Sequence, residues 1–262
     1  MALFTEIYRN GKHVWLDLRR LSEEQWCIDP FSTSVRHLLG DRYGARQRPV
    51  RVAPAAHHTM GGVKITDNCE TSILGLFAAG EVTGGLHGAN RVSGNALSET
   101  LVFGARAGNS AADWARGRTD GSSQACLQQL SERWPSKGSA KFTGADLQEG
   151  LRKIMWQDGG IVRNQEGLLR ALGTVCEIHD QVVRLSSECE SQDLTNALEL
   201  RSATRVATFI LNGALQRRES RGAHFREDFP EQDDERWRGH LQVHVDACGE
   251  DVWYFEPEQP AV

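Results

Sequence analysis

The sequence predicts a partial α/β (α+β) domain followed by a bundle of α-helices. In the first part, an apolar run at residues 76–80 ends in glycine and leads through a glycine-rich loop into a helical pattern from Asn95. In the second part, apolar residues recur with the 3.6-residue period of a helix in three segments between about residues 146 and 218. A glycine-ended strand before a helix is typical of a sheet covered by helices, whereas consecutive periodic helices pack against one another.

The remaining elements are short. Alternating apolar and polar residues at 14–18 predict a strand, and the valines of 50–52 predict a second one. The residues after Ser22 indicate a helical turn, and 63–65 and 241–245 indicate two further strands. For the helix from Asn95 we expect one shared apolar face, which carries Leu97, Leu101, Ala105 and Ala112.

Composition excludes several classes of protein. Lys+Arg 30 against Asp+Glu 35 gives a net charge of -5, so a strongly basic nucleic-acid-binding protein is not expected. No apolar run approaches the length of roughly 20 residues that spans a bilayer, and no secretory signal is visible. The six cysteines form no CxxC pair, so we expect no metal site and a reducing, cytoplasmic compartment.

Four strings within 54–97 concentrate the residues that carry chemistry: PAAHHTMGG, GLFAAGE, HGANR and SGNAL. The last opens the helix, where unpaired backbone N–H groups and the helix dipole favour an anion or an electron-rich ring edge. Taken alone it could be no more than an N-cap at Asn95. Glu81 follows the predicted strand, where a carboxylate can accept hydrogen bonds from ribose hydroxyls, although a surface acid in a turn is the simpler interpretation.

Two side chains of these strings could bind a carboxylate. Arg91 offers a planar fork of donors, and His57 adds a donor whose charge is tunable. For His58 and His87 we expect structural roles, because most histidines outside a site are structural. Further along, the charged residues of 214–230 predict a structural clamp that ties the helical bundle to the domain before it.

Together these strings resemble the flavoprotein subunit of the succinate dehydrogenase/fumarate reductase family, which includes L-aspartate oxidase. The resemblance extends over nearly the whole chain and includes the segment 214–230, which is similar to the end of that family's C-terminal helical domain. It implies FAD as the cofactor and hydride transfer to or from a C4 dicarboxylate. Motif by motif, it implies that His57 and Arg91 bind the substrate and that Glu81, Ala96 and Leu97 contact FAD.

The family's G-x-G-x-x-G string is missing from this chain. The resemblance is therefore to the C-terminal part only, with a partial FAD-binding domain that lacks its N-terminal Rossmann βαβ unit. We expect a capping-domain remnant with re-entry strands at 1–50, the second half of the FAD-binding domain at 51–118, a linker at 119–145, the helical domain at 146–230 and a tail at 231–262. Apolar surface that would pack on the missing half is expected to be exposed.

The resemblance implies an FAD-dependent oxidoreductase that is inactive as an isolated chain. We expect a second polypeptide to supply the dinucleotide-binding half and the cap, which holds the family's proton-donating arginine, so no catalytic residue is assigned here. An iron–sulfur subunit would relay electrons, and such partners would make the chain peripheral to the inner membrane. The alternatives are a fragment similar to L-aspartate oxidase and a non-catalytic remnant or interaction module.

Overall fold

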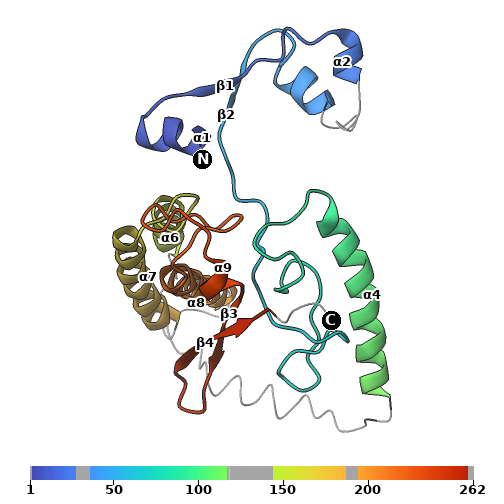
Figure 1. The fold of residues 1–262 in the computed structure, drawn as a ribbon, viewed down its shortest axis with the longest axis vertical. Coiled ribbons are helices and arrows are strands. Elements are labelled where there is room, and N and C mark those ends of the chain that lie inside the picture. The colour runs from blue at the N-terminus through green and yellow to red at the C-terminus, as the bar shows by residue number, and fades with distance from the viewer. Residues whose placement is uncertain (1, 28–35, 117, 119–143, 187–193, 259–262) are drawn as a thin grey trace. The chain divides into compact units, whose positions relative to one another are not determined.

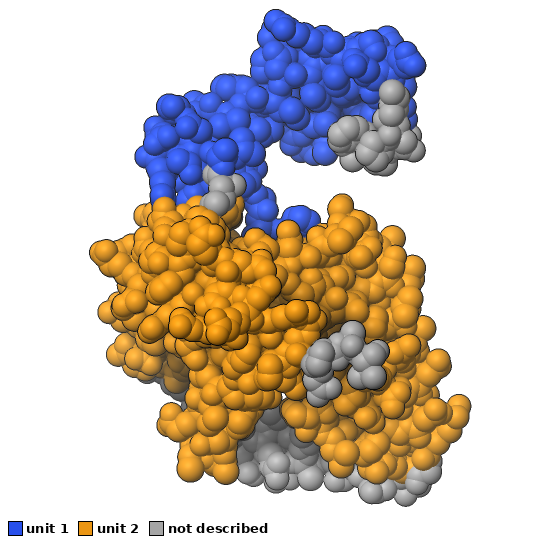
Figure 2. Space-filling view, viewed as in Figure 1, with its two compact units in different colours: residues 1–57 blue, residues 58–262 orange. Residues whose placement is uncertain are grey.

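The computed structural model describes residues 2–27, 36–116, 118, 144–186 and 194–258. The chain divides into two compact units, residues 1–57 and 58–262, which Figure 2 colours separately. Most of the predicted linker lies outside the described residues. Within the described ranges, no helix combines the length and the apolar character needed to cross a bilayer.

The first unit contains one small antiparallel sheet. Strand β1 (Val14–Leu16) pairs with β2 (Val50–Val52), which confirms both predicted strands. The predicted helical turn is also confirmed, because Ser22 and Gln25 form a reciprocal cap at the start of α2 (Glu23–Cys27): Ser22 Oγ accepts from the Gln25 N–H at 3.1 Å, and Gln25 Oε1 accepts from the Ser22 N–H at 2.9 Å. The described residues of this unit also form α1 (Ala2–Phe4) and the π-helical turns η1 (Thr5–Arg9) and η2 (Leu38–Arg42).

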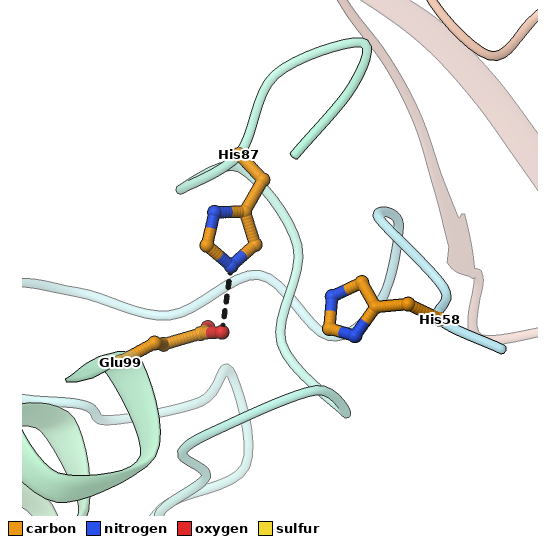
Figure 3. Close-up of side chains that lie close together, drawn as sticks. All are labelled: His58, His87 and Glu99. Carbon is orange, nitrogen blue, oxygen red and sulfur yellow. Dashed lines mark hydrogen bonds and ion pairs between the residues drawn. The ribbon is translucent and has the colours of Figure 1, made fainter. Parts of the chain in front are cut away.

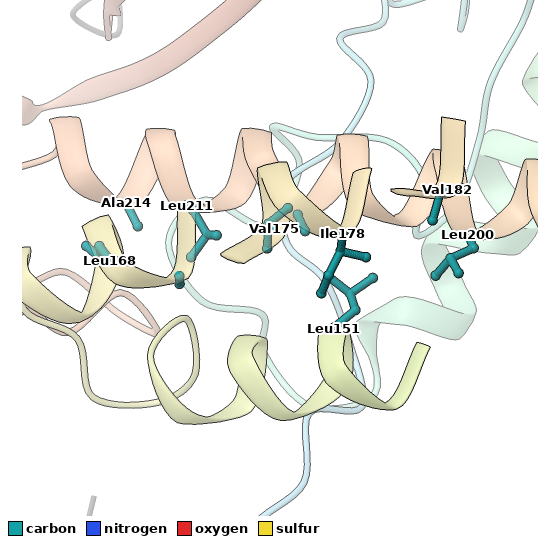
Figure 4. Close-up of a cluster of buried hydrophobic side chains, with 10 residues drawn as sticks. Leu151, Leu168, Val175, Ile178, Val182, Leu200, Leu211 and Ala214 are labelled. Carbon is teal, nitrogen blue, oxygen red and sulfur yellow. The ribbon is translucent and has the colours of Figure 1, made fainter. Parts of the chain in front are cut away.

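The predicted helical bundle is confirmed in the second unit. Helices α6 (Ala145–Gln157), α7 (Gln165–Ser186) and α8 (Leu194–Gln216) pack together through the apolar residues that carry the 3.6-residue period. Figure 4 shows these side chains meeting between the helices. The core consists of Leu151, Leu168, Ala171, Val175, Ile178, Val182, Leu200, Ala207, Leu211 and Ala214.

A β-hairpin follows the bundle. A single helical turn, α9 (Asp234–Trp237), precedes β3 (Gly239–Val245), which contains the predicted strand and pairs antiparallel with β4 (Asp251–Pro257). The Trp253 ring lies against Phe209 of α8, with ring centroids 6.4 Å apart. Strand β4 was not predicted from the sequence, although the hairpin packs on the bundle through it.

The glycine-rich segment before α4 (Asn95–Ala115) is largely irregular, as Figure 1 shows. The strands predicted at 63–65 and 76–80 are wrong: each has a single bridge, Val63 with Thr83 and Phe77 with Glu70. A strand needs a neighbour along its whole length to pair its N–H and C=O groups, and no described segment continues beside these runs.

Helix α4 is confirmed, and leucines of its predicted apolar face are exposed. Leu97 is 70% exposed and Leu101 66%, and in the loop before the helix Leu74 is 80% and Val92 70% exposed. Several large apolar side chains exposed in one region are typical of a surface that another protein segment covers. This exposure agrees with the expectation that the surface facing a missing half is uncovered.

Candidate functional site

Two glycines bring separate parts of the loop before α4 into close contact. The Val63 N–H donates to the Val82 carbonyl at 2.8 Å, and the Gly84 N–H donates to the Val63 carbonyl at 3.0 Å. A Cβ on Gly62 would lie 2.2 Å from the Val82 oxygen, so only glycine permits this approach. Gly62 and Gly84 therefore hold the His58 segment beside the Glu81 segment.

Glu81 ties these two segments together with its carboxylate. Its Oε1 accepts a hydrogen bond from the Thr59 N–H at 2.9 Å, and its Oε2 lies 3.3 Å from His58 Nδ1. The Glu81 side chain is still 53% exposed, so its oxygens have room for a further donor such as a hydroxyl. The structure thus gives Glu81 a positioning role in the loop, and its predicted contact with FAD stays a prediction.

The N-terminus of α4 has the features that suit an electron-rich group. Its N-cap is Gly94, with a φ of +91° and no side-chain hydrogen bond, so the suggested cap at Asn95 is wrong. The first turn carries no acidic residue and includes Ala96 and Leu97, whose backbone N–H groups lie beyond the reach of intrahelical acceptors. The positive end of the helix dipole is therefore not neutralised locally, and the contact of Ala96 and Leu97 with FAD stays a prediction.

Arg91 lies in the turn just before this helix and is half-buried. The turn is held by the segment that follows the bundle, because the Ala223 N–H donates to the Ala89 carbonyl at 2.9 Å. Gly222, at a φ of +58°, allows that approach, since a Cβ there would lie 2.4 Å from the same carbonyl oxygen. The helical domain thereby shapes the turn that carries Arg91.

His57 is the last residue of the first unit and is exposed, whereas Arg91 belongs to the second. Their joint action on one substrate therefore stays a prediction. The other three predicted site residues, Glu81, Ala96 and Leu97, lie with Arg91 in the second unit.

Three buried side chains of the second unit, from His58, His87 and Glu99, come together, as Figure 3 shows. His87 Nε2 and Glu99 Oε2 are 2.8 Å apart, with side chains only 8% and 2% exposed. The His58 ring lies edge-on to His87 at a centroid distance of 5.6 Å, and its side chain is 6% exposed. Glu99 was not predicted from the sequence. An acidic residue one turn into an otherwise apolar helix face was the available signal.

The charged residues of 214–230 form a dense network within the C-terminal half. Glu219 is completely buried and accepts hydrogen bonds from Arg217, from Arg221 and from the Asp233 N–H. Burial acts to raise the pKa of Glu219, but the hydrogen bonds from Arg221 and its other donors hold that pKa below its usual value. The segment is therefore stabilised by ionised, fully paired groups.

His224 gives this network a pH-dependent stability. Burial, and next to it the positive charge of Arg163, lowers the pKa of His224 from 6.5 to about 4. Below pH 6.5, His224 binds a proton in the unfolded chain but stays neutral in the folded chain until the pH approaches 4. We therefore expect this histidine to lower the free energy of unfolding between about pH 6.5 and 4, by at most about 3 kcal/mol, with no further loss below pH 4.

Urea unfolding of the wild type and of His224→Gln across this pH range checks the expectation. Glutamine can accept from Arg163 and donate to the Arg217 carbonyl, as the neutral histidine does at 3.1 and 3.4 Å. As the pH falls from 6.5 to 4, the free energy of unfolding of the wild type should decrease relative to that of the variant. Parallel curves for the two proteins would contradict the assignment.

Comparison with known protein families settles which family this fold represents. Residues 7–97 match the FAD binding domain family, and residues 148–257 match the family described as the fumarate reductase flavoprotein C-terminal region. The chain belongs to the fumarate reductase flavoprotein family. The predicted resemblance is thus confirmed, and FAD is the cofactor of the family.

Individual relatives agree with this assignment. An uncharacterized FAD-dependent oxidoreductase of Methanocaldococcus jannaschii is 41% identical over 97% of this chain and 46% of its own length. A fumarate reductase (CoM/CoB) polypeptide of Methanothermobacter marburgensis is 37% identical over 88% of this chain and 43% of its own length. FrdA of Escherichia coli quinol fumarate reductase matches the fold with a TM-score of 0.81 at 29% identity, over 97% of this chain and 47% of that one.

Relatives of this chain also include enzymes with a different name, L-aspartate oxidase. An L-aspartate oxidase of Acinetobacter baylyi is 34% identical over 88% of this chain and 42% of its own length. The chain spans less than half the length of the curated relatives it matches.

Proposed function

We propose that this chain is the C-terminal part of a fumarate reductase/succinate dehydrogenase-type flavoprotein that transfers hydride to or from a C4 dicarboxylate. The observation that carries the proposal is the order of features over residues 91–97. A half-buried arginine leads through a left-handed glycine into a helix whose first turn carries no acidic residue. Such a segment can present a cationic donor fork to a carboxylate and, next to it, backbone N–H groups to a flavin.

Each residue of the site would have a simple task. Arg91 and His57 bind and orient the substrate carboxylates, because a guanidinium and an imidazole donate hydrogen bonds to them. The N–H groups of Ala96 and Leu97 and the exposed part of Glu81 hold the cofactor. Bound FAD would accept or donate the hydride.

The exposed apolar side chains support a partner for this chain. Leu74, Val92, Leu97 and Leu101 are each at least 66% exposed, and they flank the segments that would hold FAD. A second polypeptide with the dinucleotide-binding half and the cap would bury them. An iron–sulfur subunit would then exchange electrons with the flavin, and the assembled enzyme would be cytoplasmic and peripheral to the inner membrane.

An activity like that of L-aspartate oxidase is the second candidate, because enzymes of that name are among the relatives of this chain. Both reactions act on a substrate with two carboxylates, so the same pair of residues would serve either. Turnover of aspartate with release of peroxide, without reduction of fumarate by a reduced dye, would favour this second candidate.

Co-expression tests the proposal directly. The chain would be expressed together with the N-terminal half of the Methanothermobacter marburgensis relative, and the purified material examined for flavin absorbance and for fumarate-dependent oxidation of a reduced dye. We expect a stable complex that contains FAD and reduces fumarate, while the chain alone stays colourless and inactive. A complex that forms but excludes FAD would overturn the proposal and would favour the non-catalytic remnant.

A further inference from the structure

The cluster of His58, His87 and Glu99 is not explained by the proposed reaction. Among the described residues, these three are the group whose possible ligand atoms all lie within 4.8 Å of one another. They come from three different segments: the loop after His57, the turn before Arg91, and the second turn of α4. Two imidazoles and a carboxylate form a set of ligands that binds Zn²⁺ in many enzymes.

Hydrogen bonding accounts for only part of the cluster. The pair of His87 and Glu99 satisfies one nitrogen and one oxygen at 2.8 Å. His58 Nε2, in contrast, is buried and has no hydrogen-bond partner, an arrangement that usually costs about 1–3 kcal/mol. Figure 3 shows this edge of the His58 ring turned toward the other two side chains.

The surroundings of the two His58 nitrogens differ. Nδ1 faces a Glu81 carboxylate oxygen at 3.3 Å, a neighbour that favours an N–H at this nitrogen. In the neutral ring with its proton on Nδ1, the buried Nε2 directs a lone pair toward His87 and Glu99. An imidazole that donates through one nitrogen to a carboxylate and offers the other to a metal is the usual arrangement around protein-bound zinc.

We propose that His58 Nε2, His87 Nε2 and Glu99 bind a single divalent transition-metal ion of the Zn²⁺ class. The metal replaces the proton shared between His87 Nε2 and Glu99 Oε2, and that proton leaves to solvent. Ligands about 2.0 Å from a tetrahedral ion lie about 3.3 Å apart, so the 2.8 Å pair opens slightly and His58 moves closer.

Two neighbours hold the ligands in place. Glu81 orients His58, and the Thr83 hydroxyl lies 3.4 Å from the second oxygen of Glu99. Thr83 is itself buried, and its hydroxyl donates to the Gly80 carbonyl at 2.8 Å. Three protein ligands leave a fourth position for water, and the bound ion would cross-link the two loops to α4.

Zinc binding to the full chain, measured by competition with a chromophoric chelator, tests this site without any flavin. We expect one equivalent per chain in the wild type, an affinity at least about 100-fold weaker in His58→Gln and Glu99→Gln, and one about 10- to 100-fold weaker in Glu81→Gln. His240→Gln is the matched control, because His240 is exposed in the same unit, and it should bind zinc as the wild type does.

The proposal would be overturned by a wild-type chain that binds no zinc, or by a His58→Gln variant that binds zinc with wild-type affinity. If the variants fail to fold by near-ultraviolet circular dichroism, cobalt binding to the wild type decides the question. Visible bands of four-coordinate cobalt without a thiolate charge-transfer band support the assigned ligands. A thiolate band would place the ion on cysteine and overturn them.

Discussion

Replacing Arg226 by methionine is expected to lower the free energy of unfolding by about 3–5 kcal/mol. The Arg226 side chain is fully buried and forms two hydrogen bonds with Asp228, at 2.8 and 2.7 Å. It also donates to the carbonyls of Ala214 and Leu215 near the end of α8, at 2.7 and 3.1 Å. Methionine fills similar volume but leaves a carboxylate and two buried carbonyl oxygens without their donor.

Urea denaturation of the full chain measures this loss. The matched control is Arg236→Met, because Arg236 is 79% exposed and lies 4.0 Å from its carboxylate partner Asp233. Exposed ion pairs contribute about 1 kcal/mol or less, so this variant should unfold close to the wild type. Similar losses for the two variants would show that the buried network does not stabilise the fold as described.

The second large effect is expected at Arg91. In the complex that reduces fumarate, Arg91→Ala should lower kcat/KM for fumarate by about 100- to 1,000-fold, because a carboxylate loses its charged donor in the transition state. Arg91→Lys should restore only part of the activity, since an ammonium cannot form the bidentate fork. The flavin absorbance of the complex should be unchanged in both variants.

Arg116→Ala serves as the control for this experiment. Arg116 follows α4 and is 80% exposed, with Asp113 as its partner. It should retain wild-type kcat/KM. A wild-type kcat/KM in Arg91→Ala would remove the residue from the site, whereas a parallel loss of bound FAD would assign it to cofactor binding instead.

Most helices of this fold could be predicted from the sequence because their signal is local. The 3.6-residue period of α6, α7 and α8 arises from side chains that pack on neighbouring helices of the same chain, so pattern and burial agree. The same reasoning located α4 and its apolar face, but the period alone does not say what covers that face. The apolar residues do lie on the helix as predicted, but no described segment of the chain covers Leu97 and Leu101.

The irregular loop before α4 illustrates why the rest could not be predicted. The apolar run at 76–80 has the composition of a strand, but strand formation depends on partners distant in the sequence, and only Phe77 finds one. Glu99 was missed for a related reason. Its place on a largely apolar helix face was a signal, but whether such an acid is exposed or buried depends on which histidine the tertiary fold places beside it.

The contact of Gly222 and Ala223 with Ala89 has a consequence for the order in which the protein matures. The turn that carries Arg91 is synthesised before the backbone that shapes it, because Gly222 and Ala223 lie beyond the helical bundle in the sequence. Until Ala223 has been synthesised, the Ala89 carbonyl lacks its hydrogen-bond donor. The exposed apolar side chains of α4 can meanwhile be bound by chaperones. The turn that carries Arg91 therefore reaches its final shape only after the backbone around Gly222 has been synthesised.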